Sequence, residues 1–367
     1  MTVSRRTALA GLGALLAAPR ALVAAAHALD HGTPDWIATA EIGEGIFAPV
    51  SLAGGLDPVA AGGQAARLHW VEPAPGGPLT VAMGRRPGSL ALVFDRRSGL
   101  EVARFAPEPG RCFSGHGRFA ADGARFLAVE IDRASDAGVL TLRDPAAGFA
   151  VQAEWPTGGT GPHDLLRLGD TLVVANGGVE PFTPAAAGHD VTGSSIALLN
   201  SATGALTEVA LPGAEYASLS LRHLARAATG PMVVAAQELV RDGIARPLLF
   251  RIGSHGALAP FEAPDGVWEG FRGYLGSTAV DVSGRFVAAS SPRGGRVGIW
   301  RLDGRHLGVV PVVDGCGLAA CPQPGRFLIS SGLGELVLVE AGDDGLGVIA
   351  RRAGGPRFDN HMSLAGA

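Results

Sequence analysis

Short apolar stretches separated by glycine turns recur along the chain from about residue 36 onward. Each unit reads as an apolar strand, a turn, a second apolar strand and then a polar hairpin with two more strands. Residues 119–129, 224–235, 279–289 and 318–329 are four instances of the first hairpin. No stretch keeps apolar positions at the 3.6-residue spacing of a helix. The pattern therefore predicts an all-β protein with few helices.

The spacing of the units predicts the architecture. The residues that open the first strand of each unit are His69, His116, His163, His223, Ser277, Cys316 and His361. They lie 39 to 60 residues apart, which is the period of a four-stranded propeller blade. The seventh unit has one strand left before the chain ends, and residues 36–60 supply its missing strands. We therefore predict a single domain over residues 36–367, a seven-bladed β-propeller whose N- and C-terminal strands share one blade and remove the exposed sheet edge.

Composition supports this fold and narrows the function. The 55 glycines and 25 prolines are spread evenly, as expected for many turns between short strands. The net charge of −4 comes without a basic stripe, so nothing indicates nucleic-acid binding. Three cysteines cannot all pair within one chain. Cys316 and Cys321 are either one tight bridge or, as we favour, small buried thiols.

The N-terminal segment reads as an export signal over residues 1–28. Arg5 and Arg6 precede an apolar run, and either Ala26 or Ala28 ends a small-residue cleavage site. The paired arginines resemble the twin-arginine signal, which exports folded proteins, although Ala8 stands where that motif usually has Phe. An ordinary secretory signal is the alternative. The apolar run is too short and alanine-rich for a membrane span, so we predict a periplasmic protein with no span after cleavage.

Propeller geometry brings the strand openers together. The first strand of each blade lines the central channel, and the residues that close second strands lie at the same face. Five of the ten histidines therefore converge, and neutral imidazole is the commonest protein ligand for a transition metal. We predict a metal site in which carboxylates add to the histidines, with the ligand set His116, His163, His223, His361, Glu130 and Glu238. Other residues near this face are predicted to contact a bound ligand, namely His69, Arg85, Asn176, Glu180, Gln237 and Arg293.

The alternative for each histidine is a structural role. In WD-repeat propellers a Gly-His near each blade start hydrogen-bonds within its own blade, and Gly115-His116 fits that pattern locally. No Trp-Asp dipeptide follows it. The arginines in Arg85-Arg86-Pro87-Gly88 and Pro292-Arg293-Gly294-Gly295 are either solvated turn residues or holders of an anion or carboxylate ligand.

Several of these segments together resemble one bacterial family, the domain of unknown function 1513. The matching segments are Gly115–Phe119, Gly161–Leu165, Val174–Gly178, Leu221–Ala225, Ser291–Gly295 and Asp359–His361. The resemblance implies a periplasmic propeller related in shape to quinoprotein amine dehydrogenase β-chains and YVTN-repeat proteins. Its members often lie beside imelysin-like and di-haem oxidoreductase proteins, which implies these partners and a role in iron or copper handling. Residues 66–70 depart from the family's usual Arg-Gly-His-Gly, so His69 is placed with the ligand contacts rather than the metal ligands.

Three hypotheses follow. The first is a periplasmic protein that binds iron or copper for acquisition. The second is a non-catalytic scaffold that docks a partner protein and whose histidines are structural. The third is an oxidoreductase or hydrolase, which ranks last because no nucleophile–base pair stands out.

Overall fold

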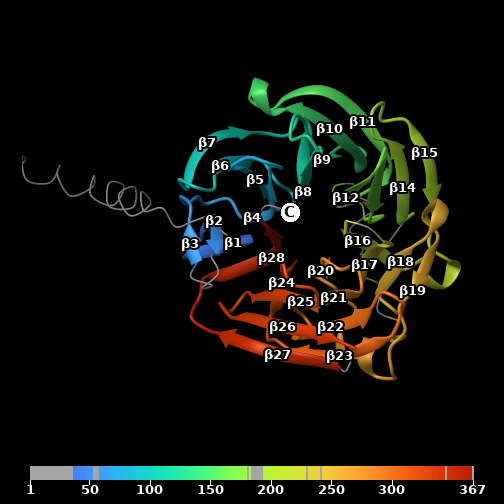
Figure 1. The fold of residues 1–367 in the computed structure, drawn as a ribbon. Helices are drawn as coiled ribbons and strands as arrows, with labels where there is room; N and C mark the ends of the chain where they lie inside the picture. The colour runs from blue at the N-terminus through green and yellow to red at the C-terminus, as the bar shows by residue number, and fades with distance from the viewer. Residues whose placement is uncertain are drawn as a thin grey trace, which may run out of the picture.

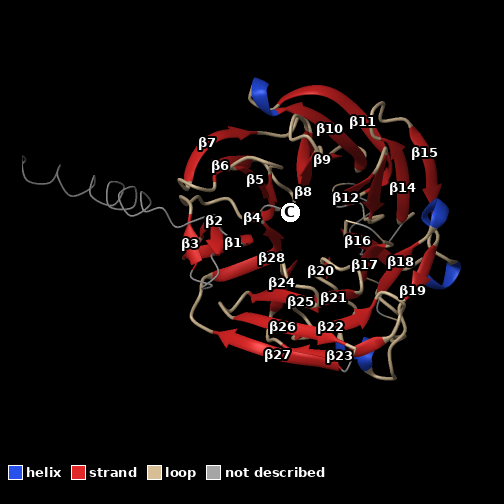
Figure 2. Cartoon of the chain, viewed as in Figure 1, coloured by secondary structure: helices blue, strands red, loops and turns tan. Residues whose placement is uncertain are grey.

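The computed structural model describes residues 36–52, 58–179, 182, 193–228, 230–239, 242–343 and 345–365. The predicted export signal and Glu180 lie outside these residues. Within them strands are the dominant secondary structure (Figure 2), and the helical segments are α2 and three short 3₁₀ turns. Their bounds are η1 (Pro145–Ala147), η3 (Ala214–Tyr216), η4 (Ser254–Gly256) and α2 (Val267–Gly270). No helix of the described part is long and apolar enough to cross a membrane.

Seven four-stranded antiparallel sheets stand around a central axis and form a β-propeller (Figure 1). The first three sheets of the chain are β4 (Leu68–Pro73), β5 (Leu79–Gly84), β6 (Ala91–Asp95) and β7 (Leu100–Phe105); β8 (Arg111–Phe119), β9 (Phe126–Asp132), β10 (Ala137–Asp144) and β11 (Ala150–Thr160); and β12 (Pro162–Leu168), β13 (Thr171–Asn176), β14 (Ser195–Asn200) and β15 (Leu206–Ala210). The next three are β16 (Leu219–Ala225), β17 (Met232–Glu238), β18 (Leu249–Ile252) and β19 (Leu258–Pro260); β20 (Ser277–Val280), β21 (Phe286–Ser291), β22 (Arg296–Arg301) and β23 (His306–Pro311); and β24 (Gly315–Ala320), β25 (Arg326–Ser331), β26 (Leu336–Gly342) and β27 (Gly345–Arg352).

The seventh sheet joins the two ends of the chain. Its strands, from the axis outward, are β28 (Arg357–Leu364), β1 (Trp36–Gly43), β2 (Ile46–Leu52) and β3 (Pro58–Ala60). The predicted fold class is thereby confirmed, including the closing blade built from both termini. This closure leaves no unpaired edge between the first and last blades.

The innermost strands of the seven sheets form a ring that lines the channel, and each contacts the innermost strands of the two neighbouring blades (Figure 1). All seven residues that were used to divide the sequence into units lie on these strands: the five histidines, Ser277 and Cys316. The hairpin turns follow the expected chemistry. Asp95 Oδ1, for example, accepts the backbone N–H groups of Arg97 at 2.8 Å and Ser98 at 3.0 Å.

The core lies between the sheets and consists of apolar side chains from facing blades. Trp300 is fully buried and stacks on Trp268 with ring centroids 5.3 Å apart, while its indole N–H donates to the Glu262 carbonyl at 2.9 Å. Phe105 and Phe149 stack at 4.6 Å between other blades. These packed interfaces hold the inner strands at fixed positions around the axis, which is what positions the site.

Candidate metal centre

Five inner strands each carry one histidine to the channel axis. His69 stands on β4, His116 on β8, His163 on β12, His223 on β16 and His361 on β28, and together they are called the histidine cluster. The inner strands all run in the same direction along the channel. The end at which they start is called the entry end, and the end at which they finish the exit end.

A local irregularity of the sheet accompanies each of these histidines. The pairing of the inner strand with its neighbour shifts register at or directly beside the histidine in β4, β8, β12, β16 and β28. A β-bulge bends the strand and redirects the side chains within it. β20, which carries Ser277 instead of histidine, pairs regularly along its length. The bulges therefore coincide with the residues that turn toward the axis, although β24 also shifts register around Cys316.

Gly115 shows why small residues surround the histidines. Its φ angle is +109°, a conformation that side chains with a Cβ rarely adopt. A Cβ at this position would also lie 2.8 Å from the His69 ring. The glycine before His116 is thus required both by the bulge and by the imidazole from the preceding blade.

The five imidazoles pack directly against one another. His116 contacts all the others, with ring centroids 5.2 Å from His69, 4.8 Å from His163, 5.6 Å from His223 and 4.8 Å from His361. The remaining neighbours, His69–His361, His361–His223 and His223–His163, lie 4.5 to 4.6 Å apart. Two groups of three offer ligand nitrogens within 4.8 Å of one another, namely His69, His116 and His163, and His116, His223 and His361. His116 belongs to both.

Most of the ring nitrogens in the cluster have no hydrogen-bond partner among the described residues. All five residues are at most 8% exposed. Both nitrogens of His116 and of His223, and the Nε2 atoms of His163 and His361, are buried without a hydrogen bond. An unsatisfied buried polar atom costs about 1–3 kcal/mol. So many of them at one point indicate a site that is completed by a ligand.

Carboxylates and a hydroxyl hold some of the rings from outside. His69 Nδ1 lies 2.7 Å from Asp359 Oδ1, His116 Nδ1 3.4 Å from Asp164 Oδ1, and Ser277 Oγ 3.4 Å from His361 Nδ1. Burial by itself raises the pKa of Asp359, but the hydrogen bond with His69 and the charges of Arg67 and Arg85 bring it well below its ordinary value. An ionised carboxylate on Nδ1 keeps a proton there and leaves Nε2 free for a metal.

Burial also keeps four of the imidazoles neutral. It lowers the pKa of His69 to about 4, even though Asp359 acts in the opposite direction. Burial, together with the neighbouring imidazoles, holds the pKa values of His163, His223 and His361 well below the ordinary value. These three rings and His69 are therefore neutral at neutral pH, which is the form that binds metals.

Comparison with known proteins now places the chain. A family model described as "Protein of unknown function (DUF1513)" matches residues 64–365. The chain belongs to the DUF1513 family. No curated protein matches it. Among solved structures, it is similar to the RRP9 WD40 repeats (TM-score 0.63, 12% identity, 86% of this chain and 89% of that one). It is also similar to U3-55K (TM-score 0.60, 13% identity, 83% and 87%) and to hydrazine synthase of Kuenenia stuttgartiensis (TM-score 0.59, 14% identity, 83% and 89%). At these identities the likeness shows the propeller fold alone.

The predicted carboxylate ligands of this DUF1513 protein lie elsewhere. Glu130 is fully buried, but its carboxylate accepts from Arg143 at 2.7 Å, from Thr141 at 2.8 Å and from the Glu108 amide at 3.2 Å. Glu238 is paired with Arg246. Neither belongs to the two groups of possible ligands found among the described residues. A residue at the end of a second strand lies at the entry end of the channel, but its side chain can point into its own sheet or toward the rim. Position along the strand therefore did not bring Glu130 and Glu238 to the histidines.

The predicted ligand-contact residues have mixed surroundings. The Asn176 amide donates to the Thr157 carbonyl of the preceding blade at 3.0 Å, and Gln237 donates to the carbonyl of Leu275, just before β20, at 3.1 Å, so these two bind backbone outside their own sheets. Arg85 lies 3.5 Å from Asp359, and the Arg293 guanidinium lies 4.4 Å from the centre of the Tyr274 ring. His69 joins one of the two histidine groups.

Four residues beside the cluster escaped the sequence analysis: Asp164, Asp359, Arg222 and Trp70. Each stands within two residues of one of the five histidines, and three lie inside the segments that carry the family resemblance. Their closeness in sequence to a channel histidine could therefore have identified these residues from the sequence. The three cysteines are buried and none forms a disulfide, and burial raises the pKa of the Cys316 thiol to about 12, which leaves it protonated.

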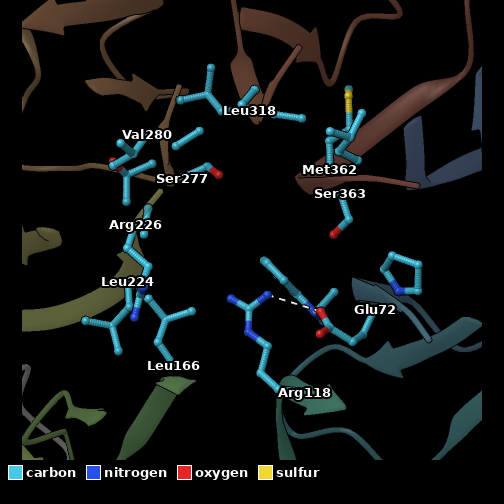
Figure 3. Close-up of a pocket in the computed structure, with 18 of the residues that line it drawn as sticks. Glu72, Arg118, Leu166, Leu224, Arg226, Ser277, Val280, Leu318, Met362 and Ser363 are labelled. Atoms are coloured by element: carbon cyan, nitrogen blue, oxygen red, sulfur yellow. Dashed lines mark hydrogen bonds and ion pairs between the residues drawn. The ribbon is translucent and has the colours of Figure 1, made fainter. Parts of the chain in front are cut away.

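A cavity of about 270 Å³ opens on the exit side of the cluster (Figure 3). Trp70 forms part of its wall, and its ring lies 5.2 Å from His116 and 5.1 Å from His361. The Arg118 guanidinium stacks on Trp70 at 3.9 Å and pairs with Glu72 at 3.1 Å. Trp70 and Arg118 thus separate the histidine cluster from this cavity.

Proposed function

We propose that this DUF1513 protein binds a transition-metal ion in the histidine cluster and serves iron or copper acquisition in the periplasm. The proposal rests above all on the convergence of five buried imidazoles, four of which carry ring nitrogens with no hydrogen-bond partner among the described residues. A purely structural cluster is expected to satisfy its polar atoms, as buried polar groups ordinarily do.

The separations suit a metal. Imidazole nitrogens bind at about 2.0–2.1 Å, so two ligands of one ion lie at most about 4.2 Å apart. The nitrogens of each group are within 4.8 Å of one another, and small ring rotations close the difference. A set of neutral imidazoles suits copper, iron and zinc, and among divalent ions copper binds such sites most tightly.

The surroundings also suit a resident ion. Asp359 on His69 and Asp164 near His116 supply negative charge to the rings, which strengthens them as donors. The predicted twin-arginine signal fits a protein that folds before export. Imelysin-like and di-haem oxidoreductase proteins remain our proposed partners for delivering or receiving the metal.

The test is metal analysis of protein purified from the periplasm. We expect one equivalent of iron, copper or zinc per chain in the natural protein and none in a His116→Ala/His163→Ala variant. A His255→Ala variant is the matched control, because His255 is exposed and paired with Glu208 on the outer surface. Metal-free protein that resists loading with each of the three metals would refute the proposal, and the histidines would then be structural.

A further inference from the structure

Two arginines at the entry end carry buried donors for which the described residues supply no acceptor. Arg222 lies in the β16 bulge directly before His223 and is 3% exposed. Its Nη1 lies 3.3 Å from His163 Nδ1, while its Nε is buried without a hydrogen bond. Arg86 follows β5, and its Nη1 is likewise buried and unpartnered.

The backbone brings these two arginines to the same place. The loop that contains Arg86 is fixed to β8 by two backbone hydrogen bonds between Gly88 and Phe113, at 2.8 and 3.0 Å. Phe113 borders the β8 bulge, where Ser114 donates to the His163 carbonyl at 3.2 Å. His163 in turn contacts Arg222. Consistent with this, the positive charge of Arg86 is felt at both Arg222 and His163.

No described carboxylate forms a close ion pair with either arginine, although the charge of Asp136 acts on Arg86. Among the described residues, no ion pair joins Arg86 or Arg222 to an acidic side chain, whereas the neighbouring Arg85 reaches Asp359. Burial, with the charge of Arg86, lowers the pKa of Arg222 to about 9 against the opposing effect of Tyr274. Arg222 therefore remains cationic at neutral pH, and so does Arg86, because a guanidinium does not lose its proton in proteins. Two like charges, one buried and one half-buried, are costly in a medium of low dielectric constant when neither has a carboxylate in contact.

We propose that Arg86 and Arg222 bind a small oxyanion, a carboxylate or a phosphate, beside the histidine cluster. The guanidinium fork matches two oxygens of such a group with paired hydrogen bonds. This site goes beyond the proposed metal function and does not depend on it, because the two arginines need a counter-ion whether or not a metal is bound.

The anion also has a consequence for His163, and this step does rest on the proposed function. Arg222 can only donate hydrogen bonds. Its contact with Nδ1 therefore leaves the His163 proton on Nε2, where it blocks a metal. An anion that takes the Arg222 donors frees Nδ1 to carry the proton and Nε2 to bind the ion. Anion and metal are then expected to strengthen each other's binding.

The experiment is calorimetric titration of the metal-free protein with phosphate and, separately, with acetate. We expect saturable binding of at least one of them, weakened about tenfold or more in Arg222→Met and in Arg86→Met, since each removes a charge-assisted contact. Arg226→Met is the matched control, because Arg226 lies at the exit end and donates to backbone carbonyls. It should bind as the natural protein does.

Each outcome of the titration either supports or overturns the anion site. Binding of phosphate alone or acetate alone identifies the oxyanion and supports the site. Absence of binding, or equal binding by Arg222→Met, overturns it. Thermal melting checks that the variants fold. If Arg222→Met does not fold, Arg86→Met still tests the site, because Arg86 is partly exposed and easier to replace. Metal content is measured on separate samples. Anion binding without metal loading sinks only the metal proposal, and metal loading without anion binding sinks only this one.

Discussion

Two buried polar clusters of this propeller differ in whether the protein completes them. Around Glu130, Arg143 donates to the carboxylate and also to the Thr141 hydroxyl at 3.0 Å and the Phe149 carbonyl at 3.2 Å. Each of these charged groups has several partners. In the histidine cluster at the channel axis, ring nitrogens from five inner strands meet, and most have no hydrogen-bond partner among the described residues. The protein itself supplies the hydrogen-bond partners of the first cluster, whereas the second needs a bound ligand to supply them.

The difference separates stability from function. A satisfied buried ion pair fixes the fold, and breaking it leaves a buried charge. Unsatisfied buried polar atoms lower the free energy of unfolding of the metal-free protein. A ligand that binds these atoms restores that free energy, so the cluster indicates a binding site. The predictions that follow test this contrast by acting on one cluster while leaving the other intact.

Acidification should act first on the histidine cluster. The folded-state pKa values of His69, His163, His223 and His361 lie below 6.5, so protonation favours the unfolded chain. Their contribution is complete above about pH 6.5 and is lost as the pH falls toward 4, the value for His69. At about 1.4 kcal/mol per pKa unit, His69 alone accounts for roughly 3 kcal/mol, and the other three add in the same direction.

The measurement is the free energy of unfolding of metal-free protein by urea between pH 7 and 4. A His163→Gln/His223→Gln variant should lose less stability over that interval than the natural protein. Asp164 and Asp359 do not confuse the result, because their stabilising contribution disappears only as the pH falls below about 4. An equal slope in both proteins would contradict the prediction.

Glu130→Ala should destabilise the fold without affecting metal binding. The change leaves the Arg143 guanidinium, which is 3% exposed, without its carboxylate. Breaking a buried pair in this way costs about 3–5 kcal/mol. Glu340→Ala is the control, because Glu340 pairs with Arg326 at the surface and such pairs contribute about 0–1 kcal/mol. Urea unfolding and metal analysis of the folded fraction are the readouts. Loss of metal in Glu130→Ala would restore Glu130 as a ligand.

His116→Ala should have the reverse effect. Because His116 belongs to both three-histidine groups, we expect metal affinity to fall by more than about 100-fold, beyond the loss typical of an outer-shell change. The stability of the metal-free protein should change by less than about 2 kcal/mol, since the cavity formed is offset by removal of two unpartnered nitrogens. Competitive titration against a chromogenic chelator gives the affinity. Retained affinity would show that His116 is not a ligand.

The sequence predicted the fold because a propeller repeats the same local rules. Apolar alternation and Gly or Asp turns mark each hairpin, and the blade period orders the hairpins. The histidines could be assigned to the inner strands for the same reason, since they occupy equivalent positions of the repeat. Even the missing strands of the last blade followed from the need to close the ring.

The side-chain directions could not be predicted in that way. The bulge around Asp359 to His361 depends on pairing with β1, a strand more than 300 residues earlier in the chain. Glu130 and Glu238 close equivalent strands, yet each pairs with an arginine supplied by the following segment of its own blade. Arg222 was overlooked because its importance lies in a buried Nε without an acceptor among the described residues, which only the three-dimensional surroundings reveal.

The smallest effect is expected from Asp359→Asn, which tests whether the carboxylate on His69 serves the metal site. The amide keeps the size of Asp359 and can still accept a hydrogen bond from His69 Nδ1, but it removes the negative charge that strengthens the ring as a donor. We expect metal affinity to fall about tenfold, less than for loss of a ligand. Asp343→Asn is the control, because Asp343 is an exposed partner of Arg285. If the metal affinity of Asp359→Asn equals that of the control, the Asp359 carboxylate stabilises only the fold, as Glu130 does. In that case the charge of Asp359 does not strengthen His69 as a metal ligand.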